Sequence, residues 1–477
     1  MRTFLSASLV ICLLQGLATA DDIDAIVSRA KASLEEADYD AAIDRLGPAT
    51  KEHPKKAVLW RLLGEATLMQ AEALASQGVS ATFIVASYRD AAEYFQKAVD
   101  LEPKTGENLA LLARAQFQGG QITEAAETAK KAVEIEPENV DHRLVLGGIQ
   151  YQLYVENQDD STRLDTARET YAQAVEIDPK NLSALNGLAY CWAIGGEQDK
   201  AVEIYEKSLR IEPSQPGVHT TLFQLLGNDQ EDNSNPLIEL YDRLIAAHPE
   251  SAAVLYYRGY ALLNNGQLSQ AEFSLQSAIA KDESYAEWVK PQLAKVKLQQ
   301  AQKTVDSNRE KASELVLAAV KLAPDVEEVR SMVDFLGGRF VSDQELDAGR
   351  EFFAEVTQLV EDNADWWNNL ALLARDTEQY EQSYQAYRKA LELKPDDPRL
   401  LNDCALIQHY HLKNDLAEAK KMYRRAIELA KEQLESPVLT TEVRQELEVA
   451  LRDAENNLDR LENGRGRRGG RGRSGDR

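Results

Sequence analysis

The histidines are the residues of this chain that could bind a metal or transfer a proton near neutral pH. His409 and His411 come closest to a ligand pair, but side chains two residues apart on a helix point away from each other. None of the others stands at a spacing known for metal ligands. The sequence therefore predicts no metal site. The six histidines are His53, His142, His219, His248, His409 and His411.

Other catalytic patterns are missing as well. The sequence holds no HExxH, GxSxG, GxxxxGK[ST] or CxxC motif. Acidic residues are abundant but spread over the polar faces of expected helices, with no isolated pair placed for general acid and base work. We therefore expect no enzyme, no metal and no cofactor, although a fold by itself never dictates function.

The net charge separates the body of the chain from its end. The 477 residues carry 54 Lys and Arg against 79 Asp and Glu, a net charge of −25. The last fourteen residues, GRGRRGGRGRSGDR, hold six of the arginines. A strongly acidic body repels phosphate polymers and anionic bilayers, so we expect it to bind no nucleic acid.

The end of the chain, residues 464–477, is too poor in apolar residues to fold, and we expect a disordered Arg/Gly-rich tail. It resembles an RGG box, which contacts RNA in intracellular proteins, but no aromatic residues separate its arginines. Three roles stay open. The tail could be a solubilising end, a contact to an anionic envelope polymer, or an intramolecular competitor for the chain's own acidic groove.

The start of the chain, residues 1–20, has the pattern of a secretory signal peptide. One cation precedes an apolar run over residues 4–14, and a small-x-small cleavage site follows at 18–20. The run is too short to cross a membrane, which takes about 20 residues. We expect an exported protein, periplasmic as the best fit and secreted or on the cell surface as alternatives. No later stretch predicts a transmembrane segment, and Cys191 and Cys404 are expected to be buried thiols.

The prolines reveal an internal repeat. An Ala-rich helix precedes each of a series of phrases such as AVEIEP and ALELKP, and a second amphipathic helix follows. Proline stops the helix before it and suits the start of the next. One such hairpin cannot bury its own apolar face, so neighbouring hairpins must stack. The phrases end at Pro103, Pro137, Pro179, Pro213 and Pro395, and two of the steps are 34 residues.

These units resemble tetratricopeptide repeats. Residues 365–398 match the family pattern, although Ser383 replaces a usual Ala. The resemblance implies an all-α, right-handed superhelical solenoid of about ten helical hairpins over residues 21–435. The hallmark positions are filled by Trp367, Leu370, Ala371, Tyr387, Ala390 and Pro395.

Several stretches depart from the pattern. Residues 68–88 add about fifteen residues within one repeat, and residues 155–163 add eight. In repeat proteins such insertions fall on loops of one face, where they can carry specificity, although neutral drift is commoner. A polar stretch at 227–236 replaces a tight turn, and the repeats around 281–308 and 325–349 are degenerate, so we expect the superhelix to bend or fray there.

Residues 436–463 predict one last helix that begins at Thr440 or Thr441 and ends at Gly464. Its leucine stripe fits either a dimerising coiled coil or a capping helix over the last hairpin. Three heptads are short for an independent coiled coil, so the stripe favours the cap.

The family resemblance also implies a binding surface. In tetratricopeptide proteins the first helix of each hairpin lines a concave groove, and Asn186, Asn368 and Asn402 share one slot in three repeats. An amide can donate to and accept from a peptide backbone, and tyrosines offer contact area at low entropic cost. These residues could equally be ordinary helix-surface and packing residues. Lys is absent from the slots of the family's carboxylate clamp. The predicted groove residues are Asn186, Tyr190, Tyr256, Tyr260, Asn368, Arg375 and Asn402, with Tyr151 and Arg114 less firmly placed.

The sequence therefore predicts a non-enzymatic scaffold of the cell envelope that holds extended or basic protein segments in an acidic concave groove. Two alternatives stay open: a binder of an anionic envelope polymer or glycan, and an assembly subunit of a secretion, pilus or outer-membrane machine. The protein or peptide partner cannot be named from the sequence.

Overall fold

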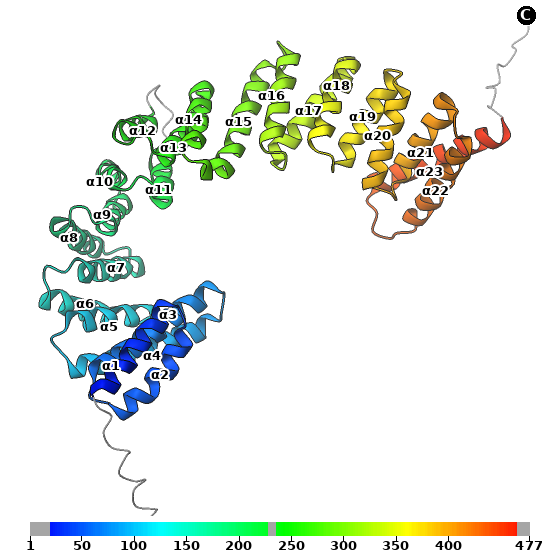
Figure 1. Cartoon of the computed structure of the whole chain (residues 1–477). Helices are drawn as coiled ribbons and strands as arrows, with labels where there is room; N and C mark the ends of the chain where they lie inside the picture. Colours follow the sequence, from blue (N-terminus) through cyan, green and yellow to red (C-terminus); the bar gives the residue numbers. More distant parts are fainter. Residues whose placement is uncertain (1–19, 228–234, 465–477) are drawn as a thin grey trace, which may run out of the picture. The chain divides into compact units, whose positions relative to one another are not determined.

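The computed structural model describes residues 20–227 and 235–464, and within these ranges the chain forms helices and no strand. It divides into two compact units, Met1–Pro249 and Glu250–Arg477. Within each unit, helices that follow each other in the chain lie side by side (Figure 1). The predicted helical solenoid is confirmed. Its right-handed superhelical sense stays a prediction.

The first unit consists of six helical hairpins in the described part of the chain. Their helices are α1 (Ala20–Glu35), α2 (Tyr39–Glu52), α3 (Ala57–Ser76), α4 (Ala81–Leu101), α5 (Gly106–Gln118), α6 (Ile122–Ile135), α7 (Val140–Glu156), α8 (Ser161–Ile177), α9 (Leu182–Ile194), α10 (Gln198–Ile211), α11 (Pro216–Leu226) and α12 (Pro236–Ala247).

Within the residues that the structure describes, the second unit adds five hairpins and a last single helix, which gives eleven hairpins where about ten were expected. Its helices are α13 (Ala252–Asn264), α14 (Leu268–Lys281), η2 (Glu283–Tyr285), α15 (Ala286–Thr304), α16 (Arg309–Leu322), α17 (Glu327–Ser342), α18 (Leu346–Leu359), α19 (Ala364–Asp376), α20 (Tyr380–Leu393), α21 (Pro398–Leu406), η3 (Ile407–Leu412), α22 (Leu416–Leu434) and α23 (Thr441–Asn463).

Alanine lets the paired helices approach closely. In α6, Ala125, Ala129 and Ala132 lie on one face and are fully buried. Their small side chains let the neighbouring helix approach closely, so the two helices pack partly through their backbone atoms. The helix ends at Ile135, just before Pro137, as the proline signal predicts.

Polar residues just after these prolines begin the next hairpin. Asn139 and Asn181 each accept hydrogen bonds at their side-chain oxygen from backbone N–H groups of the helix that follows. Asn363 does the same for α19, although it follows Glu361 and Asp362 and no proline. Such caps satisfy donors that the first helical turn leaves free, so each Pro-x-Asn junction ends one hairpin and starts another.

Glycines in the first helices receive an aromatic ring from the second. A Cβ atom added at Gly187 would lie 2.5 Å from Cε1 of Tyr171, and one added at Gly337 would lie 2.6 Å from Cζ of Phe353. No side chain fits in either place. The ring therefore packs directly on the backbone of the facing helix, which locks the hairpins together.

The two insertions do not form loops as predicted. Helices α3 and α4, which contain residues 68–88, are 20 and 21 residues long, whereas α9 and α10 are 13 and 14. The insertion at 155–163 likewise accompanies two 17-residue helices, α7 and α8. The added residues extend the helices, with Leu68, Ala71 and Ile84 buried between them.

The degenerate repeats do not fray. Residues 281–308 and 325–349 contribute full helices, α15 and α17, to their hairpins. Val333, Leu336 and Phe340 of α17 are buried in the core of the second unit. Apolar spacing is thus sufficient to keep these hairpins folded after the closing proline is lost. Of the polar stretch 227–236, residues 228–234 lie outside the described residues.

The last helix, α23, packs on α21 and α22. The side-chain oxygen of Thr440 caps its start, and Gly464 ends it with a φ of +60°, a left-handed conformation that glycine adopts without strain. Leu447, Ala450 and Ala454 are the residues of α23 that this packing buries. The leucine stripe therefore packs against the last hairpin and covers it.

Candidate binding surface

The predicted groove residues recur at three positions of the first helix in a hairpin. Asn186, Tyr256, Asn368 and Asn402 are each the fifth residue of their helix, Tyr190 and Tyr260 the ninth, and Arg375 the twelfth. Arg114 is the ninth residue of α5 and Tyr151 the twelfth of α7. Residues spaced i, i+4 and i+7 share one side of a helix. We call these three positions the first-helix stripe.

In the first unit, neighbouring hairpins are connected through this stripe. Nη2 of Arg114 lies 2.6 Å from Oε1 of Glu72 on α3. The hydroxyl groups of Tyr151 and Tyr190 lie 3.4 Å apart, and their rings meet edge to face. Burial and this hydrogen bond raise the pKa of Tyr151. Tyr190 keeps 40% of its surface exposed, so the pair presents an aromatic surface to solvent.

The three asparagines of the shared slot have different surroundings. Asn186 is half-buried and donates to Oε1 of Gln215, the residue that precedes α11. Asn402 is only 5% exposed, and both ends of its amide are bonded: it donates to Asp403 and accepts from Asn457 of α23. Asn402 therefore does not lie open to a partner as predicted, because the last helix covers it. Asn368 is half-exposed, with no hydrogen bond to any residue that the structure describes.

Tyr256 and Tyr260 lie on α13, beside an aromatic cluster at the start of α15. The ring of Tyr256 lies 6.0 Å from that of Tyr285 and 6.5 Å from that of Trp288, measured between centroids. Trp288 is 54% exposed. Both tyrosines are half-buried, so part of their surface is used in packing and part faces solvent.

Arg375 lines the α17–α19 hollow, a cavity of about 500 Å³ on the stripe of the second unit. Gly338, Val341 and Leu372 supply apolar walls, and Val341 is exposed. A Cβ atom added at Gly338 would meet nothing within 4 Å, so the missing side chain leaves space there. The full lining is Asp334, Gly337, Gly338, Val341, Ser342, Phe353, Asn369, Leu372, Leu373, Arg375 and Asp376.

Charged groups line the same hollow and are held in place. Nε of Arg375 donates to Asp376 at 2.8 Å, a contact that raises the pKa of the guanidinium group. The indole of Trp366 donates to Oδ1 of Asp334 at 3.0 Å. With two carboxylates and one guanidinium group, the hollow combines an apolar floor with a net negative charge.

Sequence reasoning missed the main residues of this hollow. Gly338 is the twelfth residue of α17 and Leu372 the ninth of α19, so both stand on the first-helix stripe. Phe335, the ninth residue of α17, is 47% exposed on the same stripe. The helix register could have identified these residues. Counting the same helix positions into the repeat at 325–349, which was predicted to be degenerate, places Phe335 and Gly338 on the stripe.

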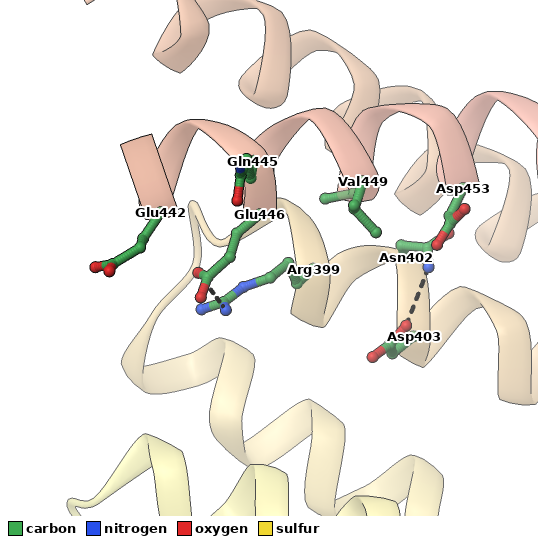
Figure 2. Close-up of a pocket in the computed structure, with 9 residues that line it drawn as sticks. Arg399, Asn402, Asp403, Glu442, Gln445, Glu446, Val449 and Asp453 are labelled. Carbon is green, nitrogen blue, oxygen red and sulfur yellow. Dashed lines mark hydrogen bonds and ion pairs between the residues drawn. The ribbon is translucent and has the colours of Figure 1, made fainter. Parts of the chain in front are cut away.

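A second hollow, the α21–α23 hollow, has a volume of about 490 Å³. Figure 2 shows Glu446 of α23 and Arg399 of α21 meeting at this hollow. Burial raises the pKa of the Asp403 carboxyl, against the opposing effects of the hydrogen bond from Asn402 and the charge of Arg375. The lining residues are Arg399, Asn402, Asp403, Glu442, Gln445, Glu446, Val449, Ala450 and Asp453.

Among the described residues, no group of three or more His, Cys, Asp or Glu side chains is placed to hold a metal ion. Within the same ranges, no helix is long and apolar enough to cross a membrane. Cys191 and Cys404 are free and buried, as predicted. The predicted signal peptide, apart from its last residue, and the Arg/Gly-rich tail beyond Gly464 lie outside the described residues.

Comparison with protein families gives a consistent result. Models of the tetratricopeptide repeat match five stretches of the chain, in both units. These are residues 86–149, 157–216, 240–273, 364–397 and 409–433.

Among curated proteins, the chain is similar to the peroxisomal targeting signal receptor of Candida albicans. The two are 24% identical over 208 residues, which cover 42% of this chain and 33% of the receptor. The matched part therefore spans about a third of that relative's length.

Among solved structures, the chain is similar to MamA from Desulfovibrio magneticus, with 19% identity, a TM-score of 0.33 and coverage of 42% of this chain and 99% of that one. For YrrB, described as a TPR protein with an unusual peptide-binding site, identity is 20%, the TM-score 0.28 and coverage 43% and 97%. For the C-terminal part of a TPR repeat-containing protein from Cytophaga hutchinsonii, the values are 12%, 0.39, 64% and 98%.

Proposed function

The chain belongs to the tetratricopeptide repeat family, and we propose that it is a non-enzymatic scaffold that holds an extended segment of a partner protein in the α17–α19 hollow. Repeats of this family support a role in protein–protein interaction. The Candida albicans relative is named a targeting signal receptor, which is consistent with a binding role.

The observation that carries this proposal is the open space at Gly338. A helical glycine with no neighbour within 4 Å of its absent Cβ performs no packing role, in contrast to Gly337 beside it. Its helix loses stability relative to alanine at this position. The site gains an apolar depression next to Leu372 and the exposed Val341, with room for one side chain of a ligand.

The charges of the hollow define the preferred partner. Asp334 and Asp376 outnumber Arg375, so a Lys or Arg of the partner is favoured beside the apolar side chain that enters the depression. Phe335 extends the apolar contact along α17. An extended segment that carries an apolar residue and a nearby basic residue fits this chemistry, in agreement with the sequence prediction of extended or basic segments.

We test the site with Gly338→Leu, which fills the hollow without a backbone clash. Peptides selected from a random displayed library on the purified full chain serve as probes. We expect them to be enriched in apolar residues next to Lys or Arg, and to bind Gly338→Leu at least tenfold more weakly than the unmodified chain.

Gly217→Leu is the matched control, because an added Cβ at this helical glycine also meets nothing within 4 Å and the residue lies on α11, outside the hollow. Its affinity for the same peptides should stay within twofold. If the selected peptides bind Gly338→Leu as tightly as the unmodified chain, the assignment of the hollow is wrong.

For the location, we propose export to the cell envelope, with the periplasm as the best fit. The pattern of residues 1–20 is what supports it. Cell fractionation and N-terminal sequencing of the purified protein test this point. A chain that starts at Asp21 and is recovered outside the cytoplasm agrees with export, whereas a cytoplasmic chain that retains residues 2–20 contradicts it.

A further inference from the structure

The residues that line the α21–α23 hollow carry more negative than positive charge. Among these described lining residues Arg399 is the one cation, whereas Asp403, Glu442, Glu446 and Asp453 supply four carboxylates. Nη1 of Arg399 lies 2.8 Å from Glu446, a contact drawn in Figure 2. Within the described ranges, Asp403 and Glu442 form no ion pair. Arg452, which does not line the hollow, lies 3.6 Å from Asp453. The hollow thus keeps an excess of about two negative charges and favours a cationic occupant.

The floor of the hollow suits a peptide segment whose residues are either small or cationic. Val449 is 44% exposed and Ala450 lies beside it, one helical step along α23. The exposed side chain of Val449 offers apolar contact to a glycine-rich backbone, and the carboxylates of the lining remain for guanidinium groups. Guanidinium groups bind carboxylates through paired N–H donors, so arginine is better suited here than lysine.

The chain itself carries such a segment next to the hollow. Residues 465–477 follow Gly464, where α23 ends, and contain six arginines and five glycines. At about 1.5 Å per helical residue, Asp453 lies roughly 17 Å back along α23 from Gly464 and Glu442 roughly 33 Å back. Thirteen extended residues span up to about 43 Å. The segment is therefore long enough to return along α23 and reach every carboxylate of the hollow.

We propose that residues 465–477 occupy the α21–α23 hollow of their own chain, with arginine side chains paired to the carboxylates of Asp403, Glu442 and Asp453. A covalently attached segment has an effective concentration in the millimolar range, so it excludes weakly basic segments of other proteins.

Site-specific photo-crosslinking of the full chain tests this occupancy directly. A benzophenone amino acid at Val449 should crosslink to a peptide from residues 465–477 within one chain, at a yield that does not depend on protein concentration. The same probe at Phe273, which is 70% exposed on α14, serves as control and should give no such product. Absence of the tail product at Val449, equal yields at both positions, or a product only between two chains would overturn the proposal.

A binding experiment separates specific occupancy from general charge attraction. The probe is a fluorescent peptide of residues 465–477, and the acceptor is a full-length variant with all six tail arginines changed to Gln. This variant should bind the probe at least tenfold more tightly than the unmodified chain, whose tail competes for the hollow. Equal affinities would contradict occupancy by the tail.

Two further variants in the Gln-tail chain locate the site. Glu442→Gln with Asp453→Asn should weaken probe binding at least tenfold. Glu448→Gln with Asp459→Asn removes the same charge from α23 at exposed positions that do not line the hollow, and should change affinity less than twofold. Equal losses would mean that the probe responds to net charge alone. This result is independent of the Gly338→Leu test, since the two hollows share no residue.

Discussion

Nδ2 of Asn457 donates a hydrogen bond to Oδ1 of Asn402 at 3.1 Å, and through it the last helix is fixed to the hairpin that it covers. Nδ2 of Asn402 in turn donates to Asp403, and the hydroxyl of Tyr410 lies 3.5 Å from Oδ1 of Asn457. Asn402 and Asn457 are both buried. Asn402 thus bonds to Asn457 and not to water or a ligand, as a groove residue would. At this repeat, the slot that Asn402 shares with Asn186 and Asn368 has a structural role.

Asn457→Ala should destabilise the second unit by about 1–3 kcal/mol, because the buried oxygen of Asn402 loses its donor. Hydrogen exchange should show faster exchange in α23 than in α19. Asn456→Ala, at the exposed neighbouring position, is the control and should change stability by less than about 0.5 kcal/mol. Equal effects of the two substitutions would contradict this account of the contact.

Two adjacent glycines of α17 should respond oppositely to alanine. Gly338→Ala should stabilise the chain by about 0.5–1 kcal/mol, since helix propensity rises and the methyl group meets no atom within 4 Å. Gly337→Ala should destabilise it by about 1–3 kcal/mol, because its methyl group would lie 2.6 Å from the ring of Phe353. Urea unfolding of both variants gives the comparison, and a loss of stability in Gly338→Ala would disprove the open-space reading.

His219 should make the first unit sensitive to acid. Its Nε2 lies 2.9 Å from the carbonyl of Pro213, so Nε2 carries the hydrogen and Nδ1 accepts from the hydroxyl of Tyr241. Burial lowers the pKa of His219 to about 4, against an opposing effect of the bond to Pro213. The folded chain therefore stays neutral at this position where the unfolded chain takes up a proton.

Between the unfolded pKa, about 6.5, and the folded pKa, stability falls with falling pH, since the unfolded state binds more protons. The loss from this residue between pH 7 and pH 5 should be about 2 kcal/mol. His219→Gln keeps a donor and an acceptor but does not titrate, so its free energy of unfolding should lack this component. If the free energies of unfolding of the variant and the unmodified chain have the same pH dependence, His219 is not the source of the acid sensitivity.

The two buried thiols should report on the two units separately. Burial raises the pKa of Cys191 to about 11 and that of Cys404 to about 12, so neither is a thiolate at pH 8. In native buffer both should react with iodoacetamide at least a hundredfold more slowly than in concentrated urea. Mass spectrometry of partly unfolded samples then assigns Cys191 labelling to the first unit and Cys404 labelling to the second. Rapid labelling of either one in native buffer would contradict its burial.

Much of the architecture could be predicted because its signals are local. The alanines before Pro137 and the Asn139 cap define a helix end and a helix start within a few residues of chain. The same helix register predicted that Asn186 and Asn368 occupy equivalent positions in their repeats. Residues 68–88 were predicted as a loop because they lengthen the repeat beyond its usual size. Their apolar residues nevertheless keep the helical spacing of α3 and α4.

The candidate site was only partly predictable, because access depends on distant segments. Arg375 was predicted and lines the α17–α19 hollow, but Gly338 lies in a repeat whose proline signal is lost. Asn402 and Asn368 share the same slot and the same residue type. Only Asn402 lies beneath α23, whose Asn457 stands 55 residues later in the chain.

The sequence by itself determined the helical hairpins, their family and the positions of the first-helix stripe, because helical periodicity and helix-ending residues act over a single turn. Only the tertiary structure decided which stripe residues remain open. That choice depends on the neighbour each residue acquires: none within 4 Å of the absent Cβ of Gly338, and the amide of Asn457 on Asn402. Burial is set by contacts between segments far apart in the chain, and no local pattern records them.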